Sequence, residues 1–371
     1  MRSQLRLNAA AIERNVAVLD RAAGGAQVCA VVKADGYGHG MVPAARAALA
    51  GGATMLAVAG AGEGAALRSA LPDAPILVLG SLDADEIPLA VGARLELTAW
   101  TTAFADAVAA ESARQDVVTP IHVKLDTGLG RLGTRDPREA DAVADRAAAA
   151  GALRLAAGWT HLATADERGD RFFGQQLERF RAWGEPLRDR HPGVLLHAAN
   201  SAAVLRDPAS HFDLVRCGVA IYGLDPFGEE PAAHGLEPAM ALTAAVGAVK
   251  RCAAGESAGY GRRFIAEQDT VLATIPVGYG DGYRRALTNR AEVAIGGTRH
   301  PVRGTVSMDN ITVDVGPAAV APGDTVELLG GAGPSAEELA RAIDTINYEI
   351  TCGFTARPER LWHRDGVPLE A

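Results

Sequence analysis

The feature that most limits what this chain can fold into is a regular alternation of short apolar runs and helical patterns. Eight runs have the Val, Ile and Leu content of buried strands, and they lie at residues 28–33, 55–59, 76–80, 95–98, 121–126, 153–161, 194–198 and 214–218. Helical patterns lie between them at residues 42–50, 61–70, 101–113, 137–150 and 172–190. This order predicts an α/β fold in which a parallel sheet closes into a (β/α)8 barrel of the TIM type. An open doubly wound sheet is the alternative.

The pattern changes near Pro238. Short β-rich runs then alternate with glycine-rich turns, at residues 242–250, 270–277, 291–295, 311–315 and 325–328, and residues 335–346 form the one helical pattern. This alternation of short strands and turns predicts a mostly antiparallel β domain. Residues 225–237, rich in Pro, Gly and Glu, suit a linker. We therefore expect a cofactor-binding barrel at residues 8–230 and a β-rich domain at residues 231–371, which residues 1–7 could join.

Composition argues against several classes of function. The net charge of -9 disfavours a nucleic-acid partner, because little positive charge is left to neutralise phosphates. The N-terminal stretch is too polar for a signal peptide and no stretch has the apolar length of a membrane span, so we expect a cytoplasmic protein without membrane contact. The four cysteines are isolated, which predicts neither a metal site nor a disulfide framework.

Reactive or polar residues follow five of the eight predicted strands. Lys33 ends the first, within VCAVVKADGYGHG, and Tyr37 lies four residues later. Among apolar neighbours the pKa of a lysine falls, and its amine can form a Schiff base with a carbonyl; a solvated lysine at a strand end is the alternative. The other strand ends carry Lys124, Asp126, Arg131, His161, Asn200, Ser201, Arg216, Gly218 and Val219. Because the carboxyl ends of barrel strands share one face, we expect these side chains there together.

The segment GLGRLG at residues 128–133 matches the dinucleotide-binding pattern G-x-G-x-x-G. A true fingerprint leads directly from a strand into a helix, whereas the next helical pattern here begins near Pro137. We prefer the interpretation that the glycines let the backbone turn Arg131 inward.

A phosphate-binding site is predicted after the seventh and eighth strands. Asn200 or Ser201 begins a helix, and backbone amides follow the eighth strand at Gly218 and Val219. Barrels often bind phosphate here, and helix N-termini attract anions, although Asn200 or Ser201 could simply cap the helix. A phosphate site together with a Schiff-base lysine points to pyridoxal 5'-phosphate.

The chain resembles the alanine racemases, a family of fold-type III pyridoxal-phosphate enzymes, from about residue 8 to about residue 358. The motifs that carry the resemblance are AVVKADGYGHG, KLDTGLGRLG, THLATADE, HAANSA, DLVRCGVAIYGL, AGYGRRF, PVGYGDGYRR, RGTVSMDN and INYEITC. The resemblance implies an isomerase that interconverts L- and D-alanine and supplies D-alanine for peptidoglycan. It also implies a homodimer whose subunits share their active sites.

The resemblance also implies roles for single residues. Lys33 would hold the cofactor and act as one base, and Tyr260, from the partner subunit, would act as the other. Cofactor-binding residues would be Tyr37, His161, Asn200, Ser201, Gly218, Val219 and Tyr348, with Arg216 at the pyridine nitrogen and Arg131 at the phenolic oxygen and the substrate carboxylate. Met308 would contact the substrate, Asp309 would lie in the channel to the site, and Lys124 would be carbamylated to hold Arg131.

Elementary chemistry is compatible with this assignment. Racemisation removes a proton from one face of the α-carbon and returns one to the other, so two bases must flank it. A tyrosine is a poor base unless cations favour its phenolate, and His161 and Arg216 could supply that charge. Because a guanidinium keeps its proton, the ring nitrogen facing Arg216 should stay unprotonated, which disfavours transamination.

The chain departs from the family pattern in its opening stretch, which is shorter and differently charged, at Ser307, where cysteine is also common, and at Asn310. The alternatives are a racemase for a wider range of small amino acids, a non-catalytic pyridoxal-phosphate-binding barrel protein and a decarboxylase. Tyr260 and Met308 argue against a carrier, and no motif supplies the recognition group for a long polar side chain that a decarboxylase would need.

Overall fold

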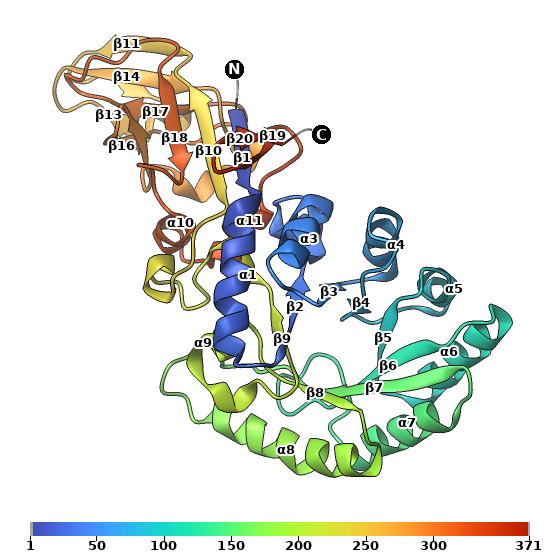
Figure 1. Ribbon diagram of the computed structural model, residues 1–371. Coiled ribbons are helices and arrows are strands. Elements are labelled where there is room, and N and C mark those ends of the chain that lie inside the picture. The colour runs from blue at the N-terminus through green and yellow to red at the C-terminus, as the bar shows by residue number, and fades with distance from the viewer. Residues whose placement is uncertain (1–2, 370–371) are drawn as a thin grey trace. The chain divides into compact units, whose positions relative to one another are not determined.

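The structure, a computed structural model, describes residues 3–369 and divides into two compact units (Figure 1). The barrel unit comprises residues Glu13–Gly36 and Gly40–Ile221. The β unit comprises the described residues before Glu13, the short segment Tyr37–His39, and the described residues from Tyr222 onward. The chain passes from one unit to the other within helix α1 (Ala9–Ala23) and around the segment that follows Lys33.

The barrel unit confirms the predicted (β/α)8 fold. Within the described residues, its parallel sheet has the order β8-β7-β6-β5-β4-β3-β2-β9. The strands are β2 (Gln27–Val31), β3 (Met55–Val58), β4 (Ile76–Val78), β5 (Glu96–Ala99), β6 (Thr119–Lys124), β7 (Leu153–Trp159), β8 (Leu195–His197) and β9 (Leu214–Cys217). The two end strands meet just beyond β8, where Asn200 forms a parallel bridge with Arg216 and the Arg216 amide donates to the Ala199 carbonyl oxygen at 2.9 Å. The sheet is therefore nearly closed, and the open-sheet alternative is wrong.

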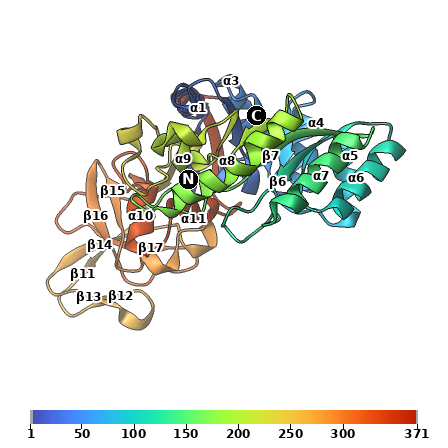
Figure 2. The ribbon, with the colours of Figure 1, turned by 90° about the horizontal axis from the view of Figure 1, so that it is seen from below.

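Helices cover the outer side of these strands (Figures 1 and 2). They are α3 (Met41–Ala50), α4 (Ala61–Ala70), α5 (Ile87–Gly92), α6 (Thr102–Arg114), α7 (Pro137–Ala149), α8 (Phe172–Arg190) and α9 (Ser201–Arg206). Every residue of β3, β4 and β9 is buried, as expected for parallel strands that are covered on both faces. The predicted helices at residues 61–70 and 172–190 coincide with α4 and α8. No helix within residues 3–369 combines the length and the apolarity that crossing a membrane requires.

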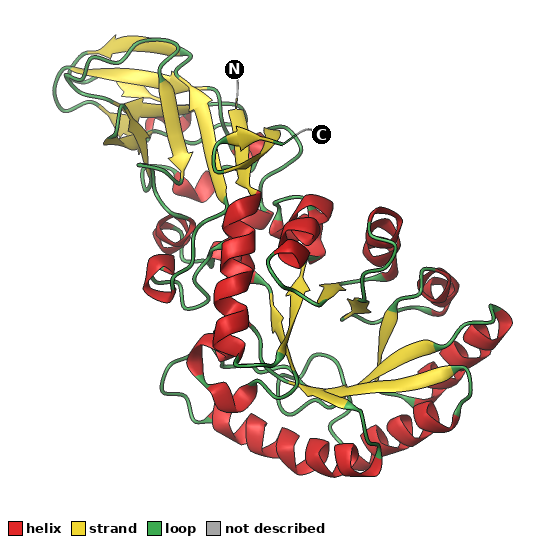
Figure 3. Cartoon of the chain, viewed as in Figure 1, coloured by secondary structure: helices red, strands yellow, loops and turns green. Residues whose placement is uncertain are grey.

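The β unit is mostly antiparallel, as predicted (Figure 3). Its main sheet has the order β11-β14-β17-β16-β15-β18-β10-β1-β19-β20, and β1 with β19 is the one parallel pair among the described strands of this sheet. The strands are β1 (Ser3–Asn8), β10 (Met240–Ala245), β11 (Ala248–Cys252), β14 (Thr270–Ile275), β15 (Glu292–Ile295), β16 (Thr298–Arg303), β17 (Ile311–Asp314), β18 (Thr325–Leu329), β19 (Glu359–Arg364) and β20 (Val367–Pro368). A separate hairpin pairs β12 (Ser257–Ala258) with β13 (Phe264–Ile265).

The helix predicted at residues 335–346 differs from the structure. The chain forms two short helices instead, α10 (Ala336–Ala342) and α11 (Asn347–Cys352). Asp344 between them has a φ of 58°, in the left-handed region where a right-handed helix cannot continue. The sequence predicts one continuous helix because no glycine or proline lies at the break between α10 and α11.

Candidate active site

Lys33 directly follows β2 and begins an unusual turn, α2 (Lys33–Tyr37). Ala34, Asp35, Gly36 and Tyr37 have φ values of 53°, 51°, 62° and 53°. A left-handed conformation costs a non-glycine residue roughly 1–2 kcal/mol, so hydrogen bonds must hold this turn. The Ala34 amide donates to Glu63 Oε1 at 2.8 Å, and the Asp35 carboxylate and carbonyl oxygens accept from the amides of Met41 and Gly40. Residues outside the turn thus fix the backbone next to Lys33.

Three side chains align at the carboxyl ends of β6, β7 and β8. Lys124, Trp159 and His197 are the last residues of their strands and are in lateral register. Lys124 Nζ lies 4.0 Å from the centroid of the Trp159 ring, and His197 stacks on Trp159 with centroids 5.4 Å apart. Burial, followed by the positive charges of Arg216 and Arg131, lowers the pKa of Lys124 to about 7. A large fraction of Lys124 is therefore an uncharged amine near neutral pH.

Arg216, in β9, is 3% exposed and donates to four acceptors. Nη2 donates to the carbonyl oxygens of Thr160 at 2.9 Å and Ala198 at 3.0 Å and to His161 Nδ1 at 3.2 Å, and Nη1 donates to His197 Nδ1 at 2.7 Å. Burial lowers the pKa of Arg216 to about 10, so the guanidinium remains protonated at neutral pH. Its orientation is fixed by neighbours on β7 and β8 and in the segments that follow them.

His161 does not carry the charge expected of it. Burial, together with Arg216, Lys124 and other nearby cations, lowers the pKa of His161 well below its ordinary value. Its Nδ1 accepts a hydrogen bond from Arg216, which also requires an unprotonated nitrogen. The positive charge at this end of the barrel comes from arginine and lysine side chains, and His161 is neutral.

The predicted phosphate-binding residues come together at the start of α9. Asn200 caps this helix, because its side chain accepts a hydrogen bond from the Ala203 amide at 3.0 Å. Ser201 Oγ accepts from the amides of Gly218 at 3.0 Å and Ala220 at 3.4 Å, and Val219 begins the short helix η3 (Val219–Tyr222). One hydroxyl and several backbone amides of successive segments therefore lie within hydrogen-bonding reach of one another, an arrangement that suits an anion.

The glycine-rich segment at residues 128–133 is a loop that Asp126 holds. The Asp126 carboxylate accepts hydrogen bonds from the amides of Gly128 and Gly130 and from Arg135 Nε, each between 3.0 and 3.1 Å. Gly133 has a φ of 109°, and a Cβ there would lie 3.0 Å from the Lys124 carbonyl oxygen. The glycines thus shape a loop that carries Arg131, which is exposed. Because α7 begins only at Pro137, the dinucleotide interpretation has no helix N-terminus to use.

Two residues predicted to bind the cofactor, Tyr37 and Tyr348, lie together in the β unit. The Tyr37 ring is 6.0 Å from that of Tyr348 and 5.1 Å from that of Tyr222, and His39 stacks on Tyr222 with centroids 4.4 Å apart. Burial, then Tyr348 and Cys352, raise the pKa of Tyr37, so its phenol keeps the proton that it would donate to an anion. The sequence did not predict that Tyr222 packs against Tyr37 and His39. Its position four residues after Gly218 is the one signal that could have indicated it.

Tyr260 and Met308, also in the β unit, are exposed. Tyr260 begins the short helix η5 (Tyr260–Arg262), its side chain is 75% exposed, and its carbonyl oxygen accepts from Thr305 Oγ1 at 2.7 Å. Gly259 has a φ of 74°, and a Cβ there would lie 2.9 Å from the Thr305 amide nitrogen. Met308 is 53% exposed, and Asp309 accepts from Arg357 Nη2 at 2.7 Å. The backbone around Tyr260 is therefore fixed while its phenol is open to solvent.

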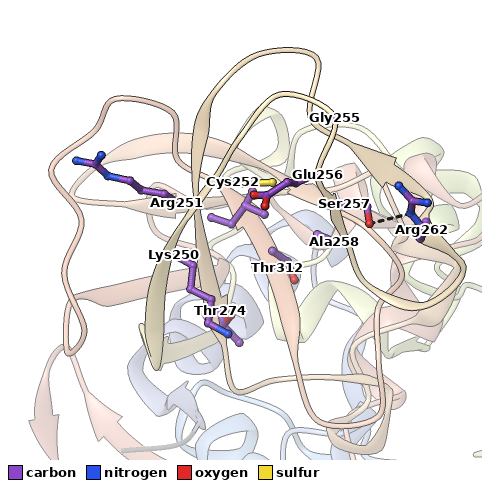
Figure 4. A pocket seen from close by; sticks show the side chains of 11 residues that line it. Lys250, Arg251, Cys252, Gly255, Glu256, Ser257, Ala258, Arg262, Thr274 and Thr312 are labelled. Atoms are coloured by element: carbon purple, nitrogen blue, oxygen red, sulfur yellow. Dashed lines mark hydrogen bonds between the residues drawn. The ribbon is translucent and has the colours of Figure 1, made fainter.

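A pocket of about 620 Å³ lies beside the Tyr260 turn (Figure 4). Arg262 Nε donates a hydrogen bond to Ser257 Oγ at 3.0 Å, drawn as a dashed line in Figure 4, while the Arg251 side chain points away from the pocket. Its lining includes none of the predicted site residues, and its cations Lys250, Arg251 and Arg262 are exposed. These features are those of an open surface depression, and we place the active site at the barrel end instead.

Comparison with known proteins identifies one family. Residues 7–226 match the sequence model of the alanine racemase N-terminal domain, and residues 239–362 match that of the C-terminal domain. The alanine racemase of Thermobifida fusca is 43% identical, over 97% of this chain and 98% of that protein.

Solved structures agree. The alanine racemase of D-cycloserine-producing Streptomyces lavendulae has a TM-score of 0.94 at 35% identity, covering 98% of this chain and 97% of that chain. The biosynthetic alanine racemase of Pseudomonas aeruginosa has a TM-score of 0.90 at 38% identity, covering 98% and 100%. Sequence, fold and the residues at the barrel end lead to the same conclusion: this chain belongs to the alanine racemase family.

Proposed function

We propose that this protein is a pyridoxal-phosphate-dependent racemase that interconverts L- and D-alanine with Lys33 and Tyr260 as its two bases. The observation that carries the proposal is the concentration of positive charge at the carboxyl end of the barrel. Arg216, Arg131 and Lys33 all act electrostatically on Lys124, and the neighbouring His161 is neutral. Such a site favours an anionic ligand, and family membership supports pyridoxal 5'-phosphate and alanine as the ligands.

The residues present fit this cofactor. Its phosphate would be bound by the Ser201 hydroxyl and the amides of Gly218 and Val219. Ser201 Oγ already accepts from the Gly218 amide, and Val219 is the next residue, at the start of η3. Asn200 holds the start of α9 in place for this contact, and the phenols of Tyr37 and Tyr348 are further donors. Lys33 would hold the cofactor covalently. The bound cofactor supplies the electron sink that acidifies the α-proton of the substrate.

Arg216 would face the ring nitrogen of the cofactor and keep it unprotonated. Its pKa of about 10 leaves the guanidinium charged over the neutral range, so it donates a hydrogen bond and retains the proton. A ring without that proton is a weaker electron sink, which limits side reactions that need a longer-lived carbanion. His161 contributes by accepting from Arg216 and fixing its orientation.

Lys33 and Tyr260 would each move a proton at the α-carbon, one on each face. The exposure of Tyr260 supports a site completed by a second copy of the chain, so we infer a homodimer in which Tyr260 serves the other subunit. Met308 would contact the substrate, and Asp309 would lie in the channel to the site.

Lys124 would become a carbamate that holds Arg131. An uncharged amine attacks carbon dioxide and releases one proton, leaving an anionic carbamate, and the low pKa of Lys124 provides that amine near neutral pH. The product would offset part of the positive charge and accept hydrogen bonds from Arg131, which would then bind the substrate carboxylate.

We infer that the enzyme works in the cytoplasm and supplies D-alanine for peptidoglycan. A racemase for a wider range of small amino acids is the second candidate.

The test combines conversion with labelling. Purified protein, with and without added pyridoxal phosphate, should convert either alanine enantiomer into the racemate, and a panel of small amino acids measures how strictly alanine is preferred. Borohydride should fix the cofactor on one lysine, and the chain has only Lys33, Lys124 and Lys250, so peptide mapping is unambiguous. A label on Lys124 or Lys250, or conversion that does not depend on the cofactor, would overturn the proposal.

A further inference from the structure

A line of hydrogen-bonded polar side chains runs through the barrel. Glu96 Oε2 lies 2.7 Å from His122 Nε2, His122 Nδ1 lies 3.0 Å from His197 Nε2, and His197 Nδ1 lies 2.7 Å from Arg216 Nη1. Glu96 is the first residue of β5, His122 is within β6, and His197 is the last residue of β8. The line therefore leads from the amino end of one strand to the carboxyl end of another, where Arg216 lies.

The three links allow only one arrangement of protons. A guanidinium has no acceptor, so Nη1 of Arg216 donates and His197 Nδ1 is unprotonated. A neutral His197 then carries its proton on Nε2 and donates to His122 Nδ1, which must also be unprotonated. His122 therefore carries its proton on Nε2 and donates to Glu96. Every hydrogen bond points from the arginine toward the carboxylate.

Burial makes this arrangement hard to change. His122 is 1% exposed and His197 is fully buried, so an unpaired N–H or lone pair would be costly. Burial, followed by Arg216, His122 and Lys124, lowers the pKa of His197 well below its ordinary value. Burial works to raise the pKa of Glu96, but the His122 hydrogen bond and the charges of Arg154 and Arg68 outweigh it and lower the pKa, so Glu96 is an anion. Trp159 stacks on His197 nearly parallel, at 10°, which restricts rotation of the imidazole.

We propose that Glu96, His122 and His197 are positioning residues that fix the tautomers of the line and thereby hold Arg216 as a charged donor in one orientation. Glu96 fixes the direction at the far end of the line, as Arg216 does at the near end, because an anionic carboxylate can only accept. With a neutral amide there, His122 and His197 could both reverse, and His197 would then present an N–H to Arg216. The catalytic consequence rests on the proposed function, in which Arg216 faces the cofactor ring, whereas the direction of the hydrogen bonds does not.

The first test measures the tautomers directly in the full-length protein, with and without pyridoxal phosphate. Nitrogen-15 NMR of labelled histidines, assigned with the variants His122→Gln and His197→Asn, should show Nδ1 unprotonated and Nε2 protonated in both rings across neutral pH. The charged groups facing the line are Arg216, Lys124, Arg68, Arg154 and Glu96. Lys124 loses its charge near neutral pH, but this should not change the tautomers, because the hydrogen bonds of Arg216 and Glu96 fix both ends of the line. Glu96→Gln should produce a second set of imidazole signals. An imidazolium, or a proton on His197 Nδ1 in the wild type, would overturn the proposal.

The second test compares holoenzyme variants with a matched control. His211 is also buried in the barrel unit, and its ring nitrogens lie 3.1 Å from the carbonyl oxygens of Ala23 and Val204, off the line. His197→Asn should lower kcat about 100-fold and Glu96→Gln about 10-fold, and both should shift the absorption band of the bound cofactor and raise the ratio of transamination to racemisation. His211→Asn should leave the band and the ratio unchanged.

The outcomes distinguish the positioning role of the line from the proposed function. Equal changes in the His211→Asn control, or an unchanged band and ratio in Glu96→Gln, would overturn the positioning role. If His197→Asn does not fold, Glu96→Gln decides the question, since the Glu96 side chain is 14% exposed and tolerates replacement best. A wild-type protein that shows the expected tautomers but neither binds pyridoxal phosphate nor racemises alanine would refute the proposed function and leave the hydrogen-bonded line intact.

Discussion

Arg216 and Lys124 in the barrel unit are buried and held by their neighbours, whereas Tyr260 and Met308 in the β unit are open to solvent. Arg216 donates to four acceptors and Lys124 is 2% exposed, while Tyr260 and Met308 are 75% and 53% exposed. The barrel thus organises its part of the site within a single chain. The β unit fixes only the backbone around Tyr260, which indicates that the phenol is positioned by a surface that the chain alone does not provide.

The largest expected effect tests this comparison in a mixture of two inactive variants. Lys33→Ala and Tyr260→Phe should each lower racemisation by roughly 10³- to 10⁴-fold, because each removes one of two bases. Unfolding and refolding the two variants together should restore a fraction of the activity, since a mixed dimer would contain one site with both bases intact.

The matched control mixes Lys33→Ala with Arg131→Ala, two changes in the same unit. Their mixed dimer would carry one lesion in each site, so activity should not return. No recovery with Tyr260→Phe would place Tyr260 in the site of its own chain, and recovery in this control would mean that Lys33 and Arg131 of one chain serve different sites.

The next prediction concerns Lys124, whose charged form is disfavoured by burial and by neighbouring cations. Its pKa falls from 10.5 to about 7 on folding, so between these values the unfolded chain binds the extra proton and the free energy of unfolding should rise with pH. Below about pH 7 both states are protonated and the burial cost of the charge is fully present. Chemical denaturation without carbon dioxide should show this slope in the wild type and not in Lys124→Met, which should be the more stable protein at low pH.

A further prediction is that carbon dioxide modifies the uncharged amine of Lys124. With labelled bicarbonate, carbon-13 NMR should show a carbamate signal that Lys124→Arg lacks, because an arginine does not provide the uncharged amine. An unmodified wild-type amine under these conditions would leave Arg131 without the support proposed for it.

A smaller effect is expected at Asp126, which organises the loop that carries Arg131. Burial would raise the pKa of Asp126, but hydrogen bonds from Gly130, Arg135 and Gly128 outweigh burial and lower it. Its contribution to stability is therefore present above the ordinary pKa of the carboxyl and is lost as pH falls through the lowered value. Asp126→Asn should cost about 2 kcal/mol near neutral pH and weaken substrate binding. The control Asp136→Asn keeps the helix cap of α7 and should change neither.

The smallest effects test stability alone, once in each unit. Thr101 caps α6 through the Phe104 amide, and Ser335 caps α10 through the Glu338 amide. Replacement of either by alanine should cost about 1 kcal/mol in the free energy of unfolding and leave kcat unchanged. A change in kcat with Ser335→Ala alone would mean that the β unit transmits local changes to the site.

Most of the barrel could be predicted because its signals are local. Apolar runs and helical periods lie within a few residues of one another, and strand ends place Lys33, Lys124, Ser201 and Arg216 on one face. Strands β1 and β19 of the β unit were missed because they pair with each other across about 355 residues of sequence, and no local pattern predicts such a pair.

The line from Glu96 to Arg216 was missed for a related reason. His122 and His197 lie inside apolar strands, and the sequence does not say which side chains meet across a closed barrel. The charge of His161 was misjudged because burial and neighbouring cations, not residue type, set its pKa. The left-handed turn after Lys33 was hidden because Gly36 is the one glycine among its four residues.

That turn also bears on the order in which the protein matures. Three of its residues are in a conformation that a short peptide would rarely visit, and the groups that offset the cost, Glu63 and the backbone of Gly40 and Met41, are supplied by segments that must already be packed. During refolding we expect the far-ultraviolet circular dichroism to recover before the yellow colour of the loaded enzyme develops. The newly synthesised chain would then be protected from premature capture of a reactive aldehyde, since the amine becomes competent only when the surrounding scaffold is complete.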